Sequence, residues 1–490
     1  MGYRDSALVL LLAFPWLNPW AFGPSPSVLS WQVSLGCGVL LWLCRHQLSA
    51  NIIFMGWVLA AVVSAVIGLL QYAGWAHGLD PWFIYAPAGE AYGNLRQKNQ
   101  FATLTNIGLA AVIGLSMKVT TANKMLKTGL ILATLVLAAA NAASASRTGL
   151  LQLIMLAGMV AVWGQWRQAE QGRLLIGGLL AYVATSMLLP LFAGNEASTL
   201  GVWSRLRTAE DACTSRLALW SNVMHLIPAR PWTGWGWGEL DYAHFITLYP
   251  GVRFCEILDN AHNLPMHLSA ELGVPVALLL CGLGLWLVWR ARPWREMNAD
   301  RQVAWSVLGL ILLHSMLEYP LWFGPFQLAA LLSVWVLVRK AELSSNTAAR
   351  LSWKMRDLVL AAGALTGLGY SAWDYHRVSQ IFYPPDFRAA AYRDNTLEKI
   401  RGTWLFQDQV QFAEFTLTPL TPGNAEHLYE MGQRVLHYSP EARVVEKLIE
   451  CAVLLGRDEA AHFYLARYKA AFPKEHARWA ARQLEPVKPH

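Results

Sequence analysis

The sequence predicts an all-α, polytopic membrane protein of about eleven transmembrane helices, with a large exported loop and an exported C-terminal helical domain. Hydrophobic residues make up 55% of the 490 residues and charged residues only 14%, whereas soluble domains carry about 25% charged residues. Apolar runs recur along the chain, and many of its 24 tryptophans and 16 tyrosines flank them. Such aromatic side chains anchor helices at the level of the lipid headgroups, so we expect a protein embedded in a lipid bilayer.

Eleven apolar runs are long enough to cross about 30 Å of hydrocarbon, if some are short or tilted. They cover residues 7–22, 28–44, 52–72, 99–117, 125–142, 148–166, 174–192, 263–289, 302–317, 321–338 and 357–373. The N-terminal run resembles a signal peptide, but no small-residue cleavage site follows it, so we interpret it as an uncleaved first span. We predict a membrane domain over 1–373, which includes a polar loop at 193–262, and a helical domain over 374–490.

Basic residues orient the predicted spans, because cytoplasmic loops of membrane proteins collect Lys and Arg. With a cytoplasmic N-terminus, the inside segments hold 16 Lys and Arg residues, and the short outside loops hold only Arg96, Lys98 and Arg147. This orientation places the 193–262 loop and everything after residue 373 outside the cytoplasm. The net charge of +7 therefore reports topology, and we expect no nucleic-acid partner.

The region after the last span has helical patterns near 388–400, 404–416, 424–438, 441–455 and 458–471. Pro440 and Pro473 close two of these helices 33 residues apart, near the tetratricopeptide period of about 34. A generic array of helical hairpins explains the pattern equally well. Either arrangement suits a module that holds a partner chain beside the membrane.

The cysteines fall into two groups. Cys37, Cys44 and Cys281 lie in or beside predicted spans, where a thiol behaves as a small apolar group. Cys213 and Cys255 share the exported loop, an oxidising setting, so we predict a disulfide between them and a free Cys451. The spacing fits no structural zinc pattern, and we predict no metal site.

The three outside basic residues lie beside amides or hydroxyls near helix starts. The run Gly93-Asn94-Leu95-Arg96-Gln97-Lys98-Asn99-Gln100 leads into the fourth span, and Ser144-Ala145-Ser146-Arg147-Thr148-Gly149 leads into the sixth. Free N–H groups and the helix dipole attract anions there. Together with Arg216 of the loop, which also carries Arg205 and Arg207, these residues predict a phosphate site at the membrane surface. The alternative is that they are snorkelling or capping residues.

His262 is the candidate base. Pro265 is tolerated only in the first turn of a helix, so the eighth span is expected to begin near Asn263 and to leave His262 at its exposed end. A neutral imidazole there can accept a proton at physiological pH. The alternatives are a capping histidine, or His225, His244 or His267 as the base; the neighbouring Asp259 modestly favours His262.

Two further features of the exported side are weaker. Trp232, Trp235 and Trp237 could stack on sugars, although exported tryptophans beside a bilayer more often lie in its interface. Glu318, in the turn between spans nine and ten, is expected to pair with an arginine of the site. Motifs for two-carboxylate hydrolysis, P-loop nucleotide binding and a serine nucleophile elbow do not occur in the exported loops. The pattern therefore favours a base that frees a hydroxyl while cations stabilise a leaving pyrophosphate.

At this point the residues resemble a known superfamily, the O-antigen ligases and polymerases of bacterial inner membranes. The resemblance covers roughly residues 90–340 and rests on the order of spans and on the motifs Ser146-Arg147-Thr148-Gly149, Arg216 followed by Trp220, Pro231 to Gly238 of the form P-x-x-G-W-G-W-G, and His262-Asn263-Leu264 ahead of Glu271-Leu272-Gly273. The Gln97 segment, the Glu318-Tyr319-Pro320-Leu321 turn and the C-terminal tail look most like the protein O-oligosaccharyltransferases among them.

The resemblance implies transfer of a glycan from undecaprenyl pyrophosphate to a Ser or Thr hydroxyl of a periplasmic, pilin-like protein, at the periplasmic face of the inner membrane and without cofactor or metal. It places the family's essential histidine on His262 and its arginines on Arg147 and Arg216. Its glutamine and tyrosine fall on Gln97 and Tyr319, with Arg96 or Lys98 as further donor contacts.

Three other functions stay open. Two are enzymes, an O-antigen ligase that acts on the lipid A core and an O-antigen polymerase. The third is a lipid-linked glycan flippase or transporter, for which ionisable residues deep within several spans are expected; here they lie mostly at span ends.

Overall fold

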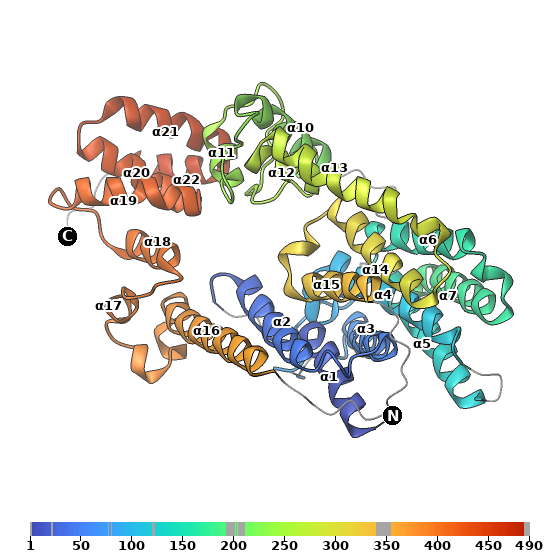
Figure 1. Ribbon diagram of the computed structural model, residues 1–490. Coiled ribbons are helices and arrows are strands. Elements are labelled where there is room, and N and C mark those ends of the chain that lie inside the picture. The colour runs from blue at the N-terminus through green and yellow to red at the C-terminus, as the bar shows by residue number, and fades with distance from the viewer. Residues whose placement is uncertain are drawn as a thin grey trace. The chain divides into compact units, whose positions relative to one another are not determined.

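The structure is a computed structural model that describes residues 2–20, 23–76, 78–79, 81–119, 123–192, 201, 203, 211–339 and 354–484 (Figure 1). Arg205 and Arg207 lie outside the described residues. All regular secondary structure in the described part is helical. The chain divides into two compact units, Met1–Ala209 with Leu287–Tyr370, and Glu210–Trp286 with Ser371–His490. The described part of the polar loop is thus grouped with the C-terminal region, whereas the sequence analysis assigned it to the membrane domain.

The first unit is a bundle of helices. Their bounds are α1 Tyr3–Leu17, α2 Pro26–Leu43, α3 Ala50–Tyr72, α4 Lys98–Ser116, α5 Lys124–Ala143, α6 Arg147–Val162, α7 Ala169–Phe192, α14 Ala299–Ser315, α15 Gly324–Val338 and most of α16 Met355–Ser379. Each coincides with one predicted run to within a few residues. Several begin at a Ser or Asn whose side chain accepts a first-turn N–H, such as Ser49 and Ser146, as expected of N-caps.

Length and composition allow four described helices to cross a membrane, namely Ala50–Tyr72, Lys124–Ala143, Ala169–Leu189 and Val274–Arg295. Ser27–Leu43, Arg147–Val162 and Gly324–Val338 are apolar but shorter. The chain therefore has the character of a multi-pass membrane protein. The count of eleven spans stays a prediction.

Buried polar side chains connect α4, α5, α6 and α14 within the apolar core of this unit. Asn106 Nδ2 donates to the carbonyl of Gly149 at 3.0 Å, and Asn141 Nδ2 donates to Asn106 Oδ1 at 2.9 Å. Gln152 Nε2 donates to the carbonyl of Leu310 at 2.9 Å. A buried polar group without a partner is costly, so these bonds favour one packing of the four helices around the start of α6.

The second unit contains α10 Arg216–Leu226, α11 Leu240–Ile246, α12 Leu264–Leu272 and most of α13 Val274–Ala291. The predicted single span over 263–289 is wrong in one respect, because it consists of α12 and α13, which Gly273 separates. Gly273 has φ +87°, and a Cβ there would lie 2.4 Å from the carbonyl oxygen of Trp232. Only glycine fits this backbone and this close approach, so the continuous apolar sequence does not form a continuous helix.

The C-terminal part of the second unit is an array of short helices (Figure 1). These are α17 Thr396–Ile400, α18 Gln407–Leu417, α19 Ala425–Tyr438, α20 Ala442–Leu454, α21 Asp458–Ala471 and α22 Pro473–Leu484. The predicted helix over 388–400 is mostly wrong. Short 3-10 turns at Pro385–Phe387 and Ala390–Tyr392 precede α17, where Pro384 and Pro385 supply no N–H to a helix. Helix α22 was not predicted.

The loop and this array share a core. Phe245 of α11 is buried with Leu428 and Val435 of α19 and Leu448 of α20. A polar contact also joins the two segments: His437 Nδ1 of α19 lies 2.7 Å from Oε2 of Glu239, the N-cap of α11. These contacts explain why the loop is grouped with the C-terminal region.

Candidate active site

His262 lies in the turn that starts α12. Its backbone has φ +50°, and its N–H donates to Asn260 Oδ1 at 2.9 Å. Asn263 is the N-cap of α12, with Oδ1 accepting from the N–H of Met266 at 3.2 Å, and Pro265 lies in the first turn. A non-glycine residue with positive φ is uncommon. The two asparagines therefore hold His262 in a defined conformation just before the helix, as the position of Pro265 predicted.

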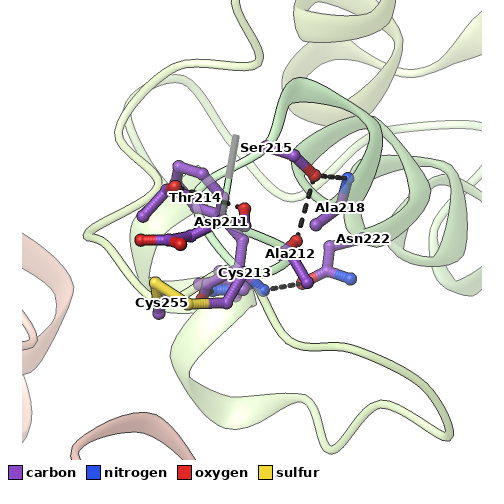
Figure 2. The surroundings of a disulfide bond; sticks show 10 residues. Asp211, Ala212, Cys213, Thr214, Ser215, Ala218, Asn222 and Cys255 are labelled. Atoms are coloured by element: carbon purple, nitrogen blue, oxygen red, sulfur yellow. Dashed lines mark hydrogen bonds between the residues drawn. A yellow bond between two sulfur atoms is a disulfide. The ribbon is translucent and has the colours of Figure 1, made fainter. Parts of the chain in front are cut away.

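Arg216 is the first residue of α10. Its N-cap Ser215 accepts from the N–H of Ala218 at 3.2 Å and donates to the carbonyl of Ala212 at 3.0 Å (Figure 2). Cys213 and Cys255 form a disulfide bond with a Cα–Cα distance of 5.3 Å, the pair that the sequence predicted. The bond fixes the chain three residues before Arg216.

Three hydrogen bonds extend this anchor through α10. The N–H of Cys255 donates to the carbonyl of Cys213 at 3.2 Å. Asn222 Oδ1 accepts from the N–H of Phe254 at 2.8 Å, and Trp220 Nε1 donates to the carbonyl of Ala261 at 3.2 Å. Helix α10 is thus bonded both to the residue before Cys255 and to the residue before His262.

Arg216 and His262 are in direct contact, with Arg216 Nη1 3.1 Å from His262 Nδ1. A guanidinium is always charged and can only donate, so Nδ1 accepts and the proton of the neutral ring is on Nε2. Both side chains come from helix starts, where free N–H groups and the dipole favour an anion. The pair can therefore offer a cation to an anionic group and, once Arg216 turns away, a basic nitrogen.

The competing histidines have other environments. His244 is buried, with Nδ1 2.9 Å from the Tyr249 hydroxyl and Nε2 3.1 Å from the carbonyl oxygen of Phe254. Burial, and then Arg253, lower its pKa to about 3, so it is a neutral core residue. His267 is buried on α12, with Nε2 3.3 Å from Glu271 Oε2. The geometry favours His262 among these candidates.

Asp259 interacts electrostatically with the histidine. Burial raises the pKa of its carboxyl, and the charges of His262 and His267 lower it in part. The carboxylate can therefore stabilise positive charge on His262 when the ring takes up a proton.

The run of Trp and Gly residues from Pro231 to Gly238 caps the C-terminal end of α12. The N–H groups of Trp235 and Gly236 donate to the carbonyls of Ala270 and Glu271 at 2.9 and 3.0 Å. Gly234 has φ +69°, and a Cβ there would lie 2.2 Å from the carbonyl oxygen of Glu271. These bonds satisfy carbonyls that a helix C-terminus leaves open. The run thus has a structural task that sequence reasoning missed. The exposure of Trp232 and Trp237 leaves the sugar-stacking hypothesis untested.

In the first unit, Arg147 is also the first residue of a helix, as Arg216 is of α10. It is the exposed first residue of α6. Its N-cap Ser146 is buried and accepts from the N–H of Gly149 at 2.9 Å. A Cβ at Gly149 would lie 2.5 Å from Ala102 Cβ and 2.6 Å from Asn141 Oδ1, so the start of α6 packs directly on α4 and α5. Arg147 therefore extends from a fixed helix end.

Glu318 brings two candidate segments of the first unit together. Its carboxylate is buried and accepts from Gln97 Nε2 and from Asn99 Nδ2, both at 3.1 Å. Tyr319 is the next residue, and its ring stacks on Phe323 with centroids 6.0 Å apart. Sequence reasoning paired Glu318 with an arginine and gave Asn99 no role; the amides that flank Lys98 were the available signal.

The other two candidate cations have partners of their own. Lys98 Nζ lies 2.8 Å from Glu90 Oε1, and Arg96 Nη2 donates to the carbonyl of Pro19 at 3.2 Å. The charge of Lys98 is therefore largely balanced by Glu90.

No group of three or more His, Cys, Asp or Glu side chains in the described part of the chain is arranged to hold a metal ion. The candidate residues supply cations, helix N-termini and the half-buried imidazole of His262. These groups can bind a phosphorylated substrate and accept a proton from a hydroxyl.

Three sequence families match the chain. The family described as O-Antigen ligase matches residues 132–281, which include Arg147, Arg216 and His262. The family described as Protein glycosylation ligase matches residues 91–113, which include Gln97 and Asn99. The family described as Virulence factor membrane-bound polymerase, C-terminal, matches residues 302–485.

The chain is also similar to a general O-oligosaccharyltransferase of Acinetobacter baylyi, with 25% identity over 158 residues, 31% of this chain. The matched segment spans 26% of that relative's length. The two ligase-family matches include the Gln97 segment and the Arg147, Arg216 and His262 motifs. Together these matches support a relationship to the protein O-oligosaccharyltransferases and the wider O-antigen ligase family, over part of the chain.

Proposed function

We propose that this protein transfers a preassembled glycan from undecaprenyl pyrophosphate to Ser or Thr hydroxyls of a periplasmic protein such as a pilin. The contact between Arg216 and His262 carries the proposal, because it joins a phosphate-binding cation to a base. The matches to an O-antigen ligase family and to a protein glycosylation ligase family support a glycan ligase.

In the proposed reaction, Arg216 exchanges its bond to His262 Nδ1 for bonds to oxygens of the donor's pyrophosphate. A planar guanidinium can grip two such oxygens. The exchange exposes the lone pair of Nδ1, so the base becomes available only when the donor is present.

His262 then takes the proton of the acceptor hydroxyl, whose oxygen forms a bond to the anomeric carbon of the glycan. The bond from that carbon to the pyrophosphate oxygen breaks, and the lipid pyrophosphate leaves with the electron pair. Asp259 stabilises the imidazolium that forms, and the arginine stabilises the charge that develops on the leaving group. The reaction uses neither ATP nor a cofactor.

Arg147 is the second arginine of the proposal. It opens α6 as Arg216 opens α10, and we assign it to an anionic part of the donor. Gln97 and Tyr319 are proposed to contact the substrates on the strength of the family resemblance, and Arg96 and Lys98 are proposed as weaker donor contacts.

The proposed location is the bacterial inner membrane, with the 193–262 loop and the C-terminal helices in the periplasm. The distribution of Lys and Arg in the sequence supports this orientation. The C-terminal helical array is proposed to hold the acceptor protein.

Transfer to the lipid A core is a second candidate function, because the O-Antigen ligase family gives the match over residues 132–281. Polymerisation is a third, because a membrane-bound polymerase family matches residues 302–485. One experiment distinguishes the three functions. Purified protein is incubated with lipid-pyrophosphate glycan and with either a pilin-like protein, lipid A core or no acceptor. The expected product is a glycosylated pilin, identified by mass spectrometry. A glycan attached only to lipid A core, or only to a second lipid-linked glycan, would overturn the proposal.

A further inference from the structure

Glu318 holds two amide side chains in one orientation. It is 5% exposed, and its Oε2 accepts from Gln97 while its Oε1 accepts from Asn99, each at 3.1 Å. A buried carboxylate is costly unless it is hydrogen-bonded. Because an ionised carboxylate only accepts, both amides must turn their NH₂ groups toward it.

The orientation of Asn99 continues to the start of α6. With its NH₂ directed at Glu318, Asn99 presents Oδ1 to Ser146, whose Oγ donates to it at 2.6 Å. The same Ser146 oxygen accepts from the N–H of Gly149 at 2.9 Å, so its hydrogen is available to Asn99. The direction of every bond from the carboxylate to the helix cap is thereby determined.

We propose that Glu318 is a positioning residue for Arg147, and that it acts through Asn99 and Ser146 to set the donor affinity of the arginine. Arg147 follows Ser146 directly, so the side chain that fixes the cap fixes the backbone from which the arginine extends. The inference rests on the proposed donor-binding role of Arg147. It adds Glu318, Asn99 and Ser146 as the residues that determine where this cation lies.

An exchange of acid and amide tests the direction of the bonds. Asn99→Asp keeps the oxygen that Ser146 needs but places two carboxylates against each other. In the double variant Glu318→Gln/Asn99→Asp, the new amide at 318 can donate to position 99 and still accept from Gln97. We expect Asn99→Asp to weaken binding of undecaprenyl pyrophosphate about tenfold or more, the size expected for a lost charged hydrogen bond. The double variant is expected to recover most of it.

A positioning role differs from a general effect on stability in one measurement, namely whether the loss of donor binding depends on the presence of Arg147. In the Arg147→Ala background, Asn99→Asp is expected to cause little further loss of lipid-pyrophosphate binding. The KM for the acceptor is expected to change little in all these variants. An equal loss with and without Arg147, or a double variant that binds the donor no better than Asn99→Asp, would overturn the inference.

Two further variants keep the test valid if Asn99→Asp unfolds. Ser146→Ala removes the last side chain of the series and is expected to weaken donor binding in the same Arg147-dependent way; full binding in this variant would contradict the proposal. Glu296→Gln is the matched control, because Glu296 is likewise a hydrogen-bonded carboxylate of the first unit, accepting from Arg301 Nε at 2.7 Å; its donor binding is expected to equal the wild type.

The proposed function and this inference fail differently. If Arg147→Ala binds undecaprenyl pyrophosphate as tightly as the wild type, the donor role of Arg147 is wrong and the inference falls with it. If Arg147→Ala loses binding while Asn99→Asp and Ser146→Ala keep it, only the inference is wrong.

Discussion

Arg216 Nη1 lies 3.1 Å from Nδ1 of His262, across 46 residues of sequence. Since the guanidinium can only donate, this contact fixes the tautomer of the ring and covers the nitrogen that would accept a proton. A phosphate that competes for the arginine is therefore expected to free Nδ1 of His262.

The first prediction concerns this arginine. Arg216→Lys keeps the charge but loses the planar fork that contacts two oxygens, so turnover is expected to fall about 10²-fold, as for other lost transition-state contacts. Arg230→Lys is the control, because Arg230 lies 4.4 Å from the ring centroid of Trp235 and has no role in the proposed chemistry. Equal rates for wild type and Arg216→Lys would reduce Arg216 to a point charge.

The second prediction separates binding from chemistry. His262→Ala leaves the arginines in place and removes the base, so lipid-linked donor is expected to bind while transfer falls roughly 10²–10⁴-fold. Protonation of the imidazole removes its acceptor lone pair, so the wild-type rate is also expected to fall toward acid pH. The residual activity of His262→Ala is not expected to show this fall toward acid pH, the acid limb of the pH–rate profile.

Equilibrium binding of the donor and a pH–rate profile check both parts. Equal losses of binding and transfer in His262→Ala would contradict the assignment, as would an unchanged acid limb. In either case His267 or Glu256 becomes the next candidate.

The third prediction concerns the disulfide. Cys213 and Cys255 close a loop with a sequence separation of 42, and removal of such a bond commonly costs about 2–4 kcal/mol. Cys213→Ala/Cys255→Ala is expected to unfold at lower temperature and to bind donor more weakly, because Arg216 begins three residues after the bond. Reductant should reproduce the effect in the wild type and have no further effect on the double variant, since the other described cysteines are free.

The helices and two site positions could be predicted from the sequence for local reasons. Apolar runs mark the helices, Pro265 marks the start of α12, and Ser146 before Arg147 has the residue type of an N-cap. These signals lie within a few residues of what they determine. The starts of α6 and α12 agree with them.

The parts that could not be predicted depend on residues distant in sequence. Hydropathy gave no sign that Gly273 interrupts 263–289, because the interruption comes from a close approach to the carbonyl of Trp232. Likewise, the direction of Asn99 is set by Glu318, 219 residues away. Composition contains no information on either contact.

The fourth prediction is topological. At Asn424, a fused reporter enzyme is expected to be active only if it is of a type that works outside the cytoplasm. At Asn298, only a reporter that works in the cytoplasm is expected to be active. The reason is the bias of Lys and Arg toward the predicted inside loops. A cytoplasmic Asn424 would place the proposed acceptor-binding helices on the wrong side of the membrane.

The last prediction concerns Asp241 on α11. Burial raises the pKa of its carboxyl to about 7, helped by Asp259 and Glu239 and opposed by a hydrogen bond from the N–H of Tyr242. An unfolded aspartate has a pKa near 3.9. Between those values the folded chain holds a proton that the unfolded chain releases, so the contribution of Asp241 to stability is present at acid pH and is lost as pH rises through about 7.

Asp241→Asn replaces the carboxyl by a neutral side chain of similar shape and removes this dependence. The variant is therefore expected to melt at a higher temperature than wild type at pH 8, with a smaller difference or none at pH 5. Thermal unfolding of both proteins in the same detergent measures it, and taking the difference between them cancels titrations that they share. Because Asp241 lines a small cavity of about 20 Å³ with His244, Arg253 and Glu256, His244→Gln is a useful control. The pKa of His244 is already lowered to about 3, so this ring stays neutral from pH 5 to 8. An unfolded histidine has a pKa near 6.5, so between pH 8 and pH 5 the unfolded wild type takes up a proton that the folded protein does not. His244→Gln removes this dependence and is expected to raise stability relative to wild type more at pH 5 than at pH 8, the opposite direction to Asp241→Asn. A difference for Asp241→Asn that is independent of pH would show that Asp241 is ionised throughout this range.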